Sequence, residues 1–169
     1  MTITESRDLL KDHDVIYFYH NRIDHTGDKM QSEGEAFKAT EETFDDLMQV
    51  IKKLTNANAS NLLITADHGF IYQNRALDDS DFLLTKIDGE VLYNDRRCVL
   101  GKSLSTDDAL KGFSAEQLGL AGEVSAVIPK GIQRLRLSGS GSRFVHGGAS
   151  LQEVLVPVIA INKKRQSDT

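Results

Sequence analysis

Two short and almost continuous apolar segments constrain the fold of this chain more than any other feature. Residues 15–19 (VIYFY) and 61–66 (NLLITA) each end abruptly in a polar cluster. Such runs are typical of strands that are covered on both faces. Between them, apolar residues recur every three or four positions over 33–55, which predicts an amphipathic helix. The order strand, helix, strand with short connections predicts a βαβ unit with two adjacent parallel strands.

Further patterns refine this fold. Ser32 and Glu35 have the spacing of a capping box, which predicts where the helix begins. The other segments with strand character are 82–86, 90–93, 96–101, 124–128, 133–137 and 156–161. Asp88-Gly89 separates the first two of these and favours the turn of a β-hairpin. We therefore expect an α/β fold with a mainly parallel sheet flanked by helices and a small antiparallel addition.

Composition excludes several classes of protein. Cys98 is the only cysteine, so an intrachain disulfide and a tetrathiolate zinc site are excluded, and a reducing, cytoplasmic setting is favoured. No apolar run approaches the ~18 residues of a membrane-spanning helix, and the first residues are too polar for a signal peptide. The net charge of −5 argues against nucleic-acid binding by general electrostatics. A substrate that carries phosphate remains compatible with it, because bound divalent metals can supply positive charge.

Polar clusters follow both predicted parallel strands, at the edge where such sheets bind ligands. Asp67-His68-Gly69 follows the second strand and offers a carboxylate and an imidazole to a divalent metal. Gly69 permits a tight turn that can direct both side chains to one side. The alternative interpretation is a polar loop tip without a ligand.

The first cluster contains Asp24 and Asp28, which are four residues apart and therefore share one face of a helical turn. Like charges held together repel, which suggests a nearby cation or hydrogen-bond donors. The alternative is an Asx-type turn with solvated acids. His25 lies between the two aspartates and is interpreted as a spectator.

A third cluster is His146-Gly147-Gly148, in which the glycines let the backbone approach a ligand closely. Its alternative interpretation is a loop histidine beside a glycine-rich turn. Taken together, the clusters provide five candidate metal ligands: Asp24, Asp28, Asp67, His68 and His146. Arg143, close to His146 in sequence, could contact a phosphate oxygen, or could be a surface arginine.

Three segments carry a family resemblance. IDHTGD, LLITADHGF and RFVHGGASLQEVLVPV resemble the PglZ family of the alkaline-phosphatase superfamily, whose members are components of BREX-type bacterial phage-defence systems. The resemblance extends over residues 15–162, although 70–130 carries no matching motif. The run from His146 to Glu153 is similar to PglZ members in particular.

The resemblance implies a two-metal site for phosphate-ester chemistry, with zinc or manganese as the ions and magnesium as an alternative. By position, Asp24, Asp28 and His146 would hold one metal, and Asp67 and His68 would help to hold the other. The metals would orient the phosphoryl group, activate the nucleophile and stabilise the leaving oxygen. Asp28 stands where most superfamily members have histidine, which favours harder ions.

The same resemblance defines the expected domain organisation. Residues 1–162 correspond to the C-terminal part of a PglZ domain, and 163–169 are predicted to form a disordered tail. The superfamily's nucleophile and first metal aspartate belong to an N-terminal segment, and neither is found here. We therefore expect the chain to be weak or inactive by itself, and its parent protein to hydrolyse phosphodiesters such as nucleic acid.

Two alternatives to the phosphoesterase interpretation follow from the sequence. The chain could be a non-catalytic interaction or scaffold module with other BREX components as partners. It could also be an unrelated α/β protein that has acids at its strand ends by chance. A fold without parallel strands at 15–20 and 61–66 would establish that last interpretation.

Overall fold

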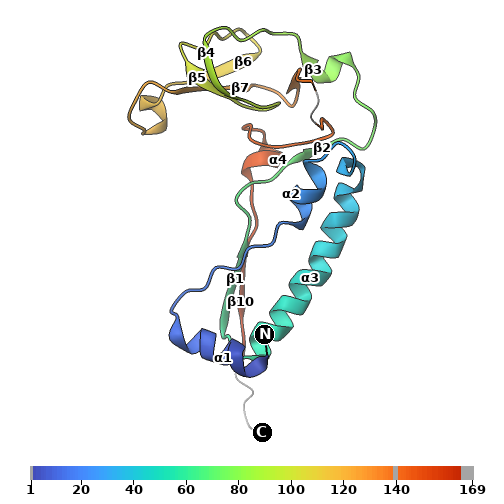
Figure 1. Cartoon of the computed structure of the whole chain (residues 1–169), viewed down its shortest axis with the longest axis vertical. Helices are drawn as coiled ribbons and strands as arrows, with labels where there is room; N and C mark the ends of the chain where they lie inside the picture. Colours follow the sequence, from blue (N-terminus) through green and yellow to red (C-terminus); the bar gives the residue numbers. More distant parts are fainter. Residues whose placement is uncertain (1, 139–140, 165–169) are drawn as a thin grey trace.

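The computed structural model describes residues 2–138 and 141–164, which form a mixed α/β structure. Figure 1 shows an elongated molecule with a four-stranded sheet at one end and helix α1 (Ile3–Asp12) at the other. Helix α3 (Ala36–Asn56) runs along one side, and the short helices α2 (Arg22–Gly27) and α4 (Leu151–Val154) lie between the two ends. None of the helices in the described part of the chain is long and apolar enough to cross a lipid bilayer.

Helix α3 confirms the helix predicted over 33–55, and a short 3-10 turn, η1 (Glu33–Glu35), leads into it. Its buried positions include the small residues Ala36 and Ala39, and helix α2 packs against it. The predicted capping box is not formed. The Ser32 hydroxyl instead donates to the carbonyl of Thr26 at 2.7 Å and so ties the end of α2 to the start of α3.

Strand β1 (Asn61–Thr65) confirms the predicted strand over 61–66, but its partner is β10 (Val158–Asn162), which runs antiparallel to it. Residues 15–19 form no strand, and the side chains of Tyr17 and Tyr19 are 79% and 88% exposed. The prediction of a mainly parallel sheet is therefore wrong for the described residues. Neither run is covered on both faces, because residues 15–19 are exposed and β1 alternates between exposed and half-buried residues. An apolar run does not identify which segment pairs with it.

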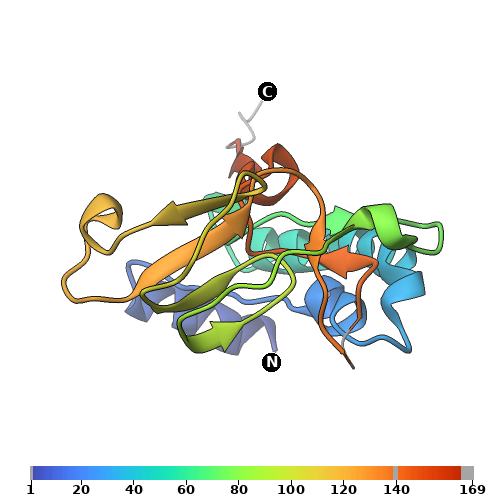
Figure 2. The same ribbon diagram turned by 90° about the horizontal axis from the view of Figure 1, so that it is seen from above.

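The four-stranded sheet confirms the small antiparallel addition. Its strands, in spatial order, are β4 (Glu90–Asn94), β5 (Val99–Lys102), β7 (Ser125–Pro129) and β6 (Leu110–Phe113), and all neighbours are antiparallel. Figure 2 shows these strands from above. The predicted hairpin across Asp88-Gly89 is wrong, because β4 turns back into β5 at residues 95–98. Residues 82–83 form β3 (Phe82–Leu83), which pairs in parallel with β8 (Arg134–Leu135).

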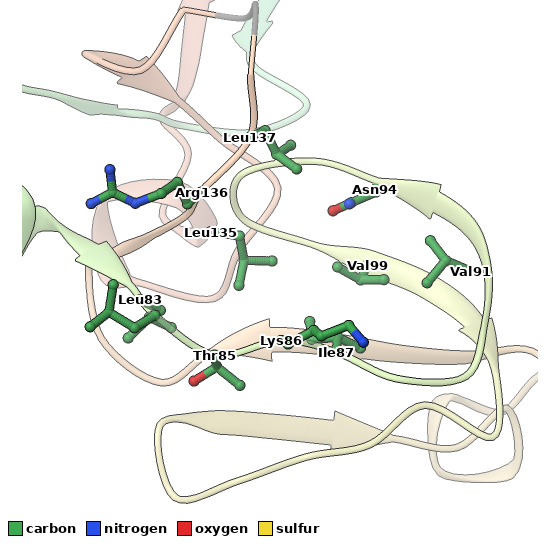
Figure 3. Close-up of a pocket in the computed structure, with 11 residues that line it drawn as sticks. Leu83, Thr85, Lys86, Ile87, Val91, Asn94, Val99, Leu135, Arg136 and Leu137 are labelled. Atoms are coloured by element: carbon green, nitrogen blue, oxygen red, sulfur yellow. The ribbon is translucent and has the colours of Figure 1, made fainter.

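A core of Val99, Leu110, Val127 and Leu135 holds this sheet together. Beside it lies a cavity of about 360 Å³ between β4, β5 and the segments around β3 and β8 (Figure 3). Its lining is mostly aliphatic, with Lys86 and Arg136 as its charged residues. Because no acid or imidazole lines it among the described residues, the cavity is not a metal site.

The remaining elements connect these parts. They are η2 (Asp79–Asp81), η3 (Glu116–Leu118) and the antiparallel pair β2 (Ile71–Tyr72) and β9 (Phe144–Val145). Of the predicted disordered tail, residues 165–169 lie outside the described residues. Lys163 is held in place, because its backbone N–H donates to the carbonyl of Ser60 at 2.8 Å.

Candidate metal centre

The three polar clusters of the sequence, which contain Asp24, His68 and His146, meet in the middle of the molecule. Asp24 lies on α2, His68 lies in the loop between β1 and β2, and His146 follows β9 directly. Each offers one ligand atom, and these three atoms lie within 4.8 Å of one another. The side chains are 33%, 28% and 30% exposed respectively, so the cluster is partly shielded and still open to water.

Local hydrogen bonding orients His68. Its Nδ1 lies 3.0 Å from the carbonyl oxygen of Gly69, which can only accept, so Nδ1 carries the proton. The Nε2 lone pair is then free, and Nε2 lies 3.7 Å from Oδ2 of Asp24. A backbone carbonyl that fixes the tautomer in this way is the usual support for a metal-binding histidine.

His146 stacks directly on His68. The two ring centroids are 4.2 Å apart and the ring planes differ by 12°. Nε2 of His146 lies 3.4 Å from Oδ1 of Asp28, the residue that ends α2. Two imidazoles therefore face one carboxylate on α2 and one on the C-cap residue of that helix.

Asp67 lies at the edge of this cluster. Its Oδ1 is 3.9 Å from Nε2 of His68 and also accepts the backbone N–H of His68 at 3.0 Å, while its side chain is 85% exposed. The structure thus brings Asp24, His68 and His146 into one cluster and places Asp28 beside His146 and Asp67 beside His68. The role of all five residues as metal ligands stays a prediction. The division into two metal sites also stays a prediction, since Asp24 lies against His68 rather than apart from it.

The donor set fits a divalent transition metal. One carboxylate and two imidazoles are ligands that Zn²⁺ accepts, and an additional carboxylate such as Asp28 extends the set toward manganese. Three protein ligands with solvent access leave room for a further ligand, as catalytic zinc sites do. The residues present therefore fit the metal that the sequence implies.

Two glycines of the polar clusters, Gly27 and Gly69, lie in direct contact with residues near His146 and in α4. A Cβ atom on Gly27 would lie 2.4 Å from the ring of Phe144, so α2 packs directly on the strand that precedes His146. A Cβ atom on Gly69 would lie 2.1 Å from the carbonyl oxygen of Gln152 in α4. The three motifs are therefore packed together at distances that only glycine allows.

Comparison with known proteins identifies the family. The family model described as the BREX system PglZ alkaline phosphatase-like domain matches residues 1–161. The chain belongs to the PglZ family. The prediction that missing parallel strands indicate a chance resemblance is therefore wrong, because a PglZ-family chain lacks them here.

Two curated relatives are named as alkaline phosphatase-like proteins. The alkaline phosphatase-like protein BrxZ of Escherichia coli O9:H4 (strain HS) is 41% identical over 93% of this chain and 18% of its own length. The alkaline phosphatase-like protein PglZ of Bacillus cereus (strain H3081.97) is 36% identical over 100% of this chain and 20% of its own length. The PglZ-family chain thus spans about a fifth of the length of these relatives.

Arg143 is engaged with backbone in this PglZ-family chain. Its guanidinium donates to the carbonyls of Gln73 and Asn74 and lies 5.6 Å from the ring centre of Tyr72. These contacts connect the chain before His146 to the residues that follow β2. A phosphate-binding role for Arg143 stays a prediction.

A buried ion pair next to the cluster was not predicted. Arg97 and Glu153 are 0% and 1% exposed and lie 2.8 Å apart. Burial alone would raise the pKa of Glu153, but hydrogen bonds from Arg97 and Ser150 outweigh it and lower the pKa to about 2. Glu153 belongs to the run that resembles PglZ members, whereas nothing in the sequence around Arg97 indicates that it is buried.

Acid should destabilise the fold through Glu153. Because its folded-state pKa is depressed from 4.5, the carboxylate contributes stability that is fully present above about pH 4.5 and lost as the pH falls toward about 2. We expect the melting temperature, followed by circular dichroism, to fall more steeply across this window in the wild-type chain than in Glu153→Gln. An equally steep decrease in the melting temperatures of the two proteins would contradict this role.

Proposed function

We propose that this chain contributes the metal-binding part of a metal-dependent phosphoesterase. The observation that carries the proposal is the convergence of Asp24, His68 and His146, three residues from three separate motifs, within 4.8 Å. Membership of an alkaline phosphatase-like family supports it.

In this proposal, Asp24 and the two histidines hold a divalent ion, with Asp28 and Asp67 as the adjacent carboxylates for the same ion or a second one. A bound ion supplies Lewis-acid stabilisation of charge on a phosphoryl oxygen. The Gly69 carbonyl keeps His68 in the tautomer whose Nε2 can bind metal. Arg143 contributes a positive charge that could bind a phosphate oxygen if its contacts to Asn74 are exchanged. No residue of this chain is assigned as the nucleophile.

The activity of the whole protein is part of the proposal, because the relatives are about five times longer than this chain. We propose a phosphodiester substrate, with nucleic acid as the class, and zinc or manganese as the metal, with magnesium as the alternative. We further propose that the protein works in the cytoplasm together with other BREX components. The scaffold alternative is less favoured, since a module without catalytic use would not need its ligand residues to converge.

Metal retention after dialysis tests the proposal. We expect the wild-type chain to retain zinc or manganese and the double variant Asp24→Ala/His146→Ala to retain none, because two of the three converging ligands are removed. His25→Ala is the matched control, since His25 lies in the same motif but contacts Lys29 at 3.0 Å rather than the cluster. Elemental analysis measures the bound metal. Equal retention by all three proteins would reject the proposed site.

A further inference from the structure

Glu153 holds the turn after His146 through its side chain. Oε1 accepts the N–H of Gly148 at 2.9 Å, and Oε2 accepts the N–H of Ser150 at 3.1 Å. The remaining acceptor positions take Nε and Nη2 of Arg97, both at 2.8 Å. A carboxylate with two backbone donors and a bidentate guanidinium has one permitted orientation.

The same residue holds the loop of the other histidine through its backbone. The N–H of Gly69, directly after His68, donates to the carbonyl of Glu153 at 2.8 Å. Gly148 comes two residues after His146, so the loops of both histidines are attached to one residue. The two loops that carry the stacked rings, 4.2 Å apart, therefore share one hydrogen-bonded anchor.

Arg97 fixes the anchor in place. Besides Glu153, its fully buried guanidinium donates to the carbonyls of Gly131 and Gln133, on the segment that leads into β8. All three nitrogens of the guanidinium therefore donate hydrogen bonds, and the group has a single orientation. A Cβ atom on Gly148 would lie 2.7 Å from Nη2 of Arg97, which shows that the turn packs directly on the ion pair.

We propose that Glu153, oriented by Arg97, is a positioning residue that sets the separation of His68 and His146 and thereby the metal affinity of the centre; the affinity part rests on the proposed function. A pair that only stabilised the fold would affect metal binding no more than any other core contact. A positioning pair changes the geometry of the two imidazoles while the chain remains folded.

The test compares Glu153→Gln with Leu110→Ala, both studied well below their melting temperatures. Glutamine keeps the shape of the side chain but places an NH₂ group where Ser150 or Arg97 also donates. The hydrogen bonds of Glu153 are therefore weakened without a change in side-chain size. Leu110 is 2% exposed in the core of the distant sheet, and its truncation destabilises the fold without touching the motifs. Glu153→Asp is the second anchor variant, because it keeps the charge but is too short to reach all four donors.

Two readouts are taken on the folded proteins: zinc affinity by calorimetry, and histidine ring signals by NMR, with the rings of His13, His20 and His25 as internal references. We expect the Glu153 variants to lose about tenfold to a hundredfold in zinc affinity, the range for residues that support metal ligands. We also expect them to lose the ring-to-ring proton contact between His68 and His146, and Leu110→Ala to change neither.

Retention of the ring contact in both Glu153 variants would overturn the positioning role. So would a zinc affinity within twofold of that of Leu110→Ala. If the wild-type chain binds no zinc, the proposed function fails, but the ring contact in the metal-free protein still decides whether Glu153 positions the histidines.

Discussion

Arg97→Met should lower the free energy of unfolding by about 3–5 kcal/mol, the cost of removing one member of a buried ion pair. The Glu153 carboxylate would be left 1% exposed without its bidentate partner, and the carbonyls of Gly131 and Gln133 would lose their donor. For a domain of this length each kcal/mol corresponds to about 2–4 °C in melting temperature. Calorimetric melting of the variant beside the wild type measures the decrease.

The double variant Arg97→Met/Glu153→Met is the control for this prediction. Removing both charges leaves no unpaired buried carboxylate, so the double variant loses only the hydrogen bonds of the pair to backbone groups, such as those from Gly148 and Ser150. We therefore expect the double variant to be more stable than Arg97→Met alone. A double variant that is less stable than the single one would show that the pair's charge is not the source of the loss.

Gly69→Ala should have the second large effect, on stability and on metal retention together. Its Cβ would lie 2.1 Å from the carbonyl oxygen of Gln152, and a backbone atom cannot rotate away as a flexible side chain can. The loop must then separate from α4 and break the hydrogen bond from the Gly69 N–H to Glu153. We expect a loss of about 1–3 kcal/mol in unfolding free energy and a large loss of retained zinc.

Gly34→Ala is the matched control for this substitution. A Cβ atom at Gly34 would meet only Nη1 of Arg143, at 3.4 Å, which is an ordinary contact. Unfolding curves and elemental analysis of both variants make the comparison. Wild-type metal content in Gly69→Ala would contradict the steric explanation.

Local periodicity predicted the elements of this fold better than their pairing. The apolar repeat of α3 and the compact run of β1 are local signals, and both elements form as expected. Pairing depends on segments far away in sequence, so β1 lies beside β10 rather than beside residues 15–19. Asp88-Gly89 is a local signal as well and predicts a hairpin turn. The chain instead reverses its direction after β4, which turns back into β5.

The convergence of Asp24, His68 and His146 was predictable from the combination of three polar clusters, each of which alone also has a common structural interpretation. An Asp-His-Gly after a strand and two aspartates four apart each restrict the geometry, and the structure brings them together with His146. The supporting residues were not predictable in this way. Arg97 follows Arg96 and Asp95 in a charged run that suggests a surface turn, yet its guanidinium is fully buried against carbonyl oxygens.

The elongated shape of the chain, of which the exposed segment 15–19 is one part, has a thermodynamic consequence. The folded chain presents 11883 Å² to solvent, whereas a compact monomer of 18.7 kDa presents about 8,300 Å². Unfolding therefore uncovers only about four-fifths of the surface expected for this mass. Since denaturant sensitivity and the heat-capacity change both scale with newly uncovered surface, this chain should unfold over a broader range of urea and temperature than its length implies.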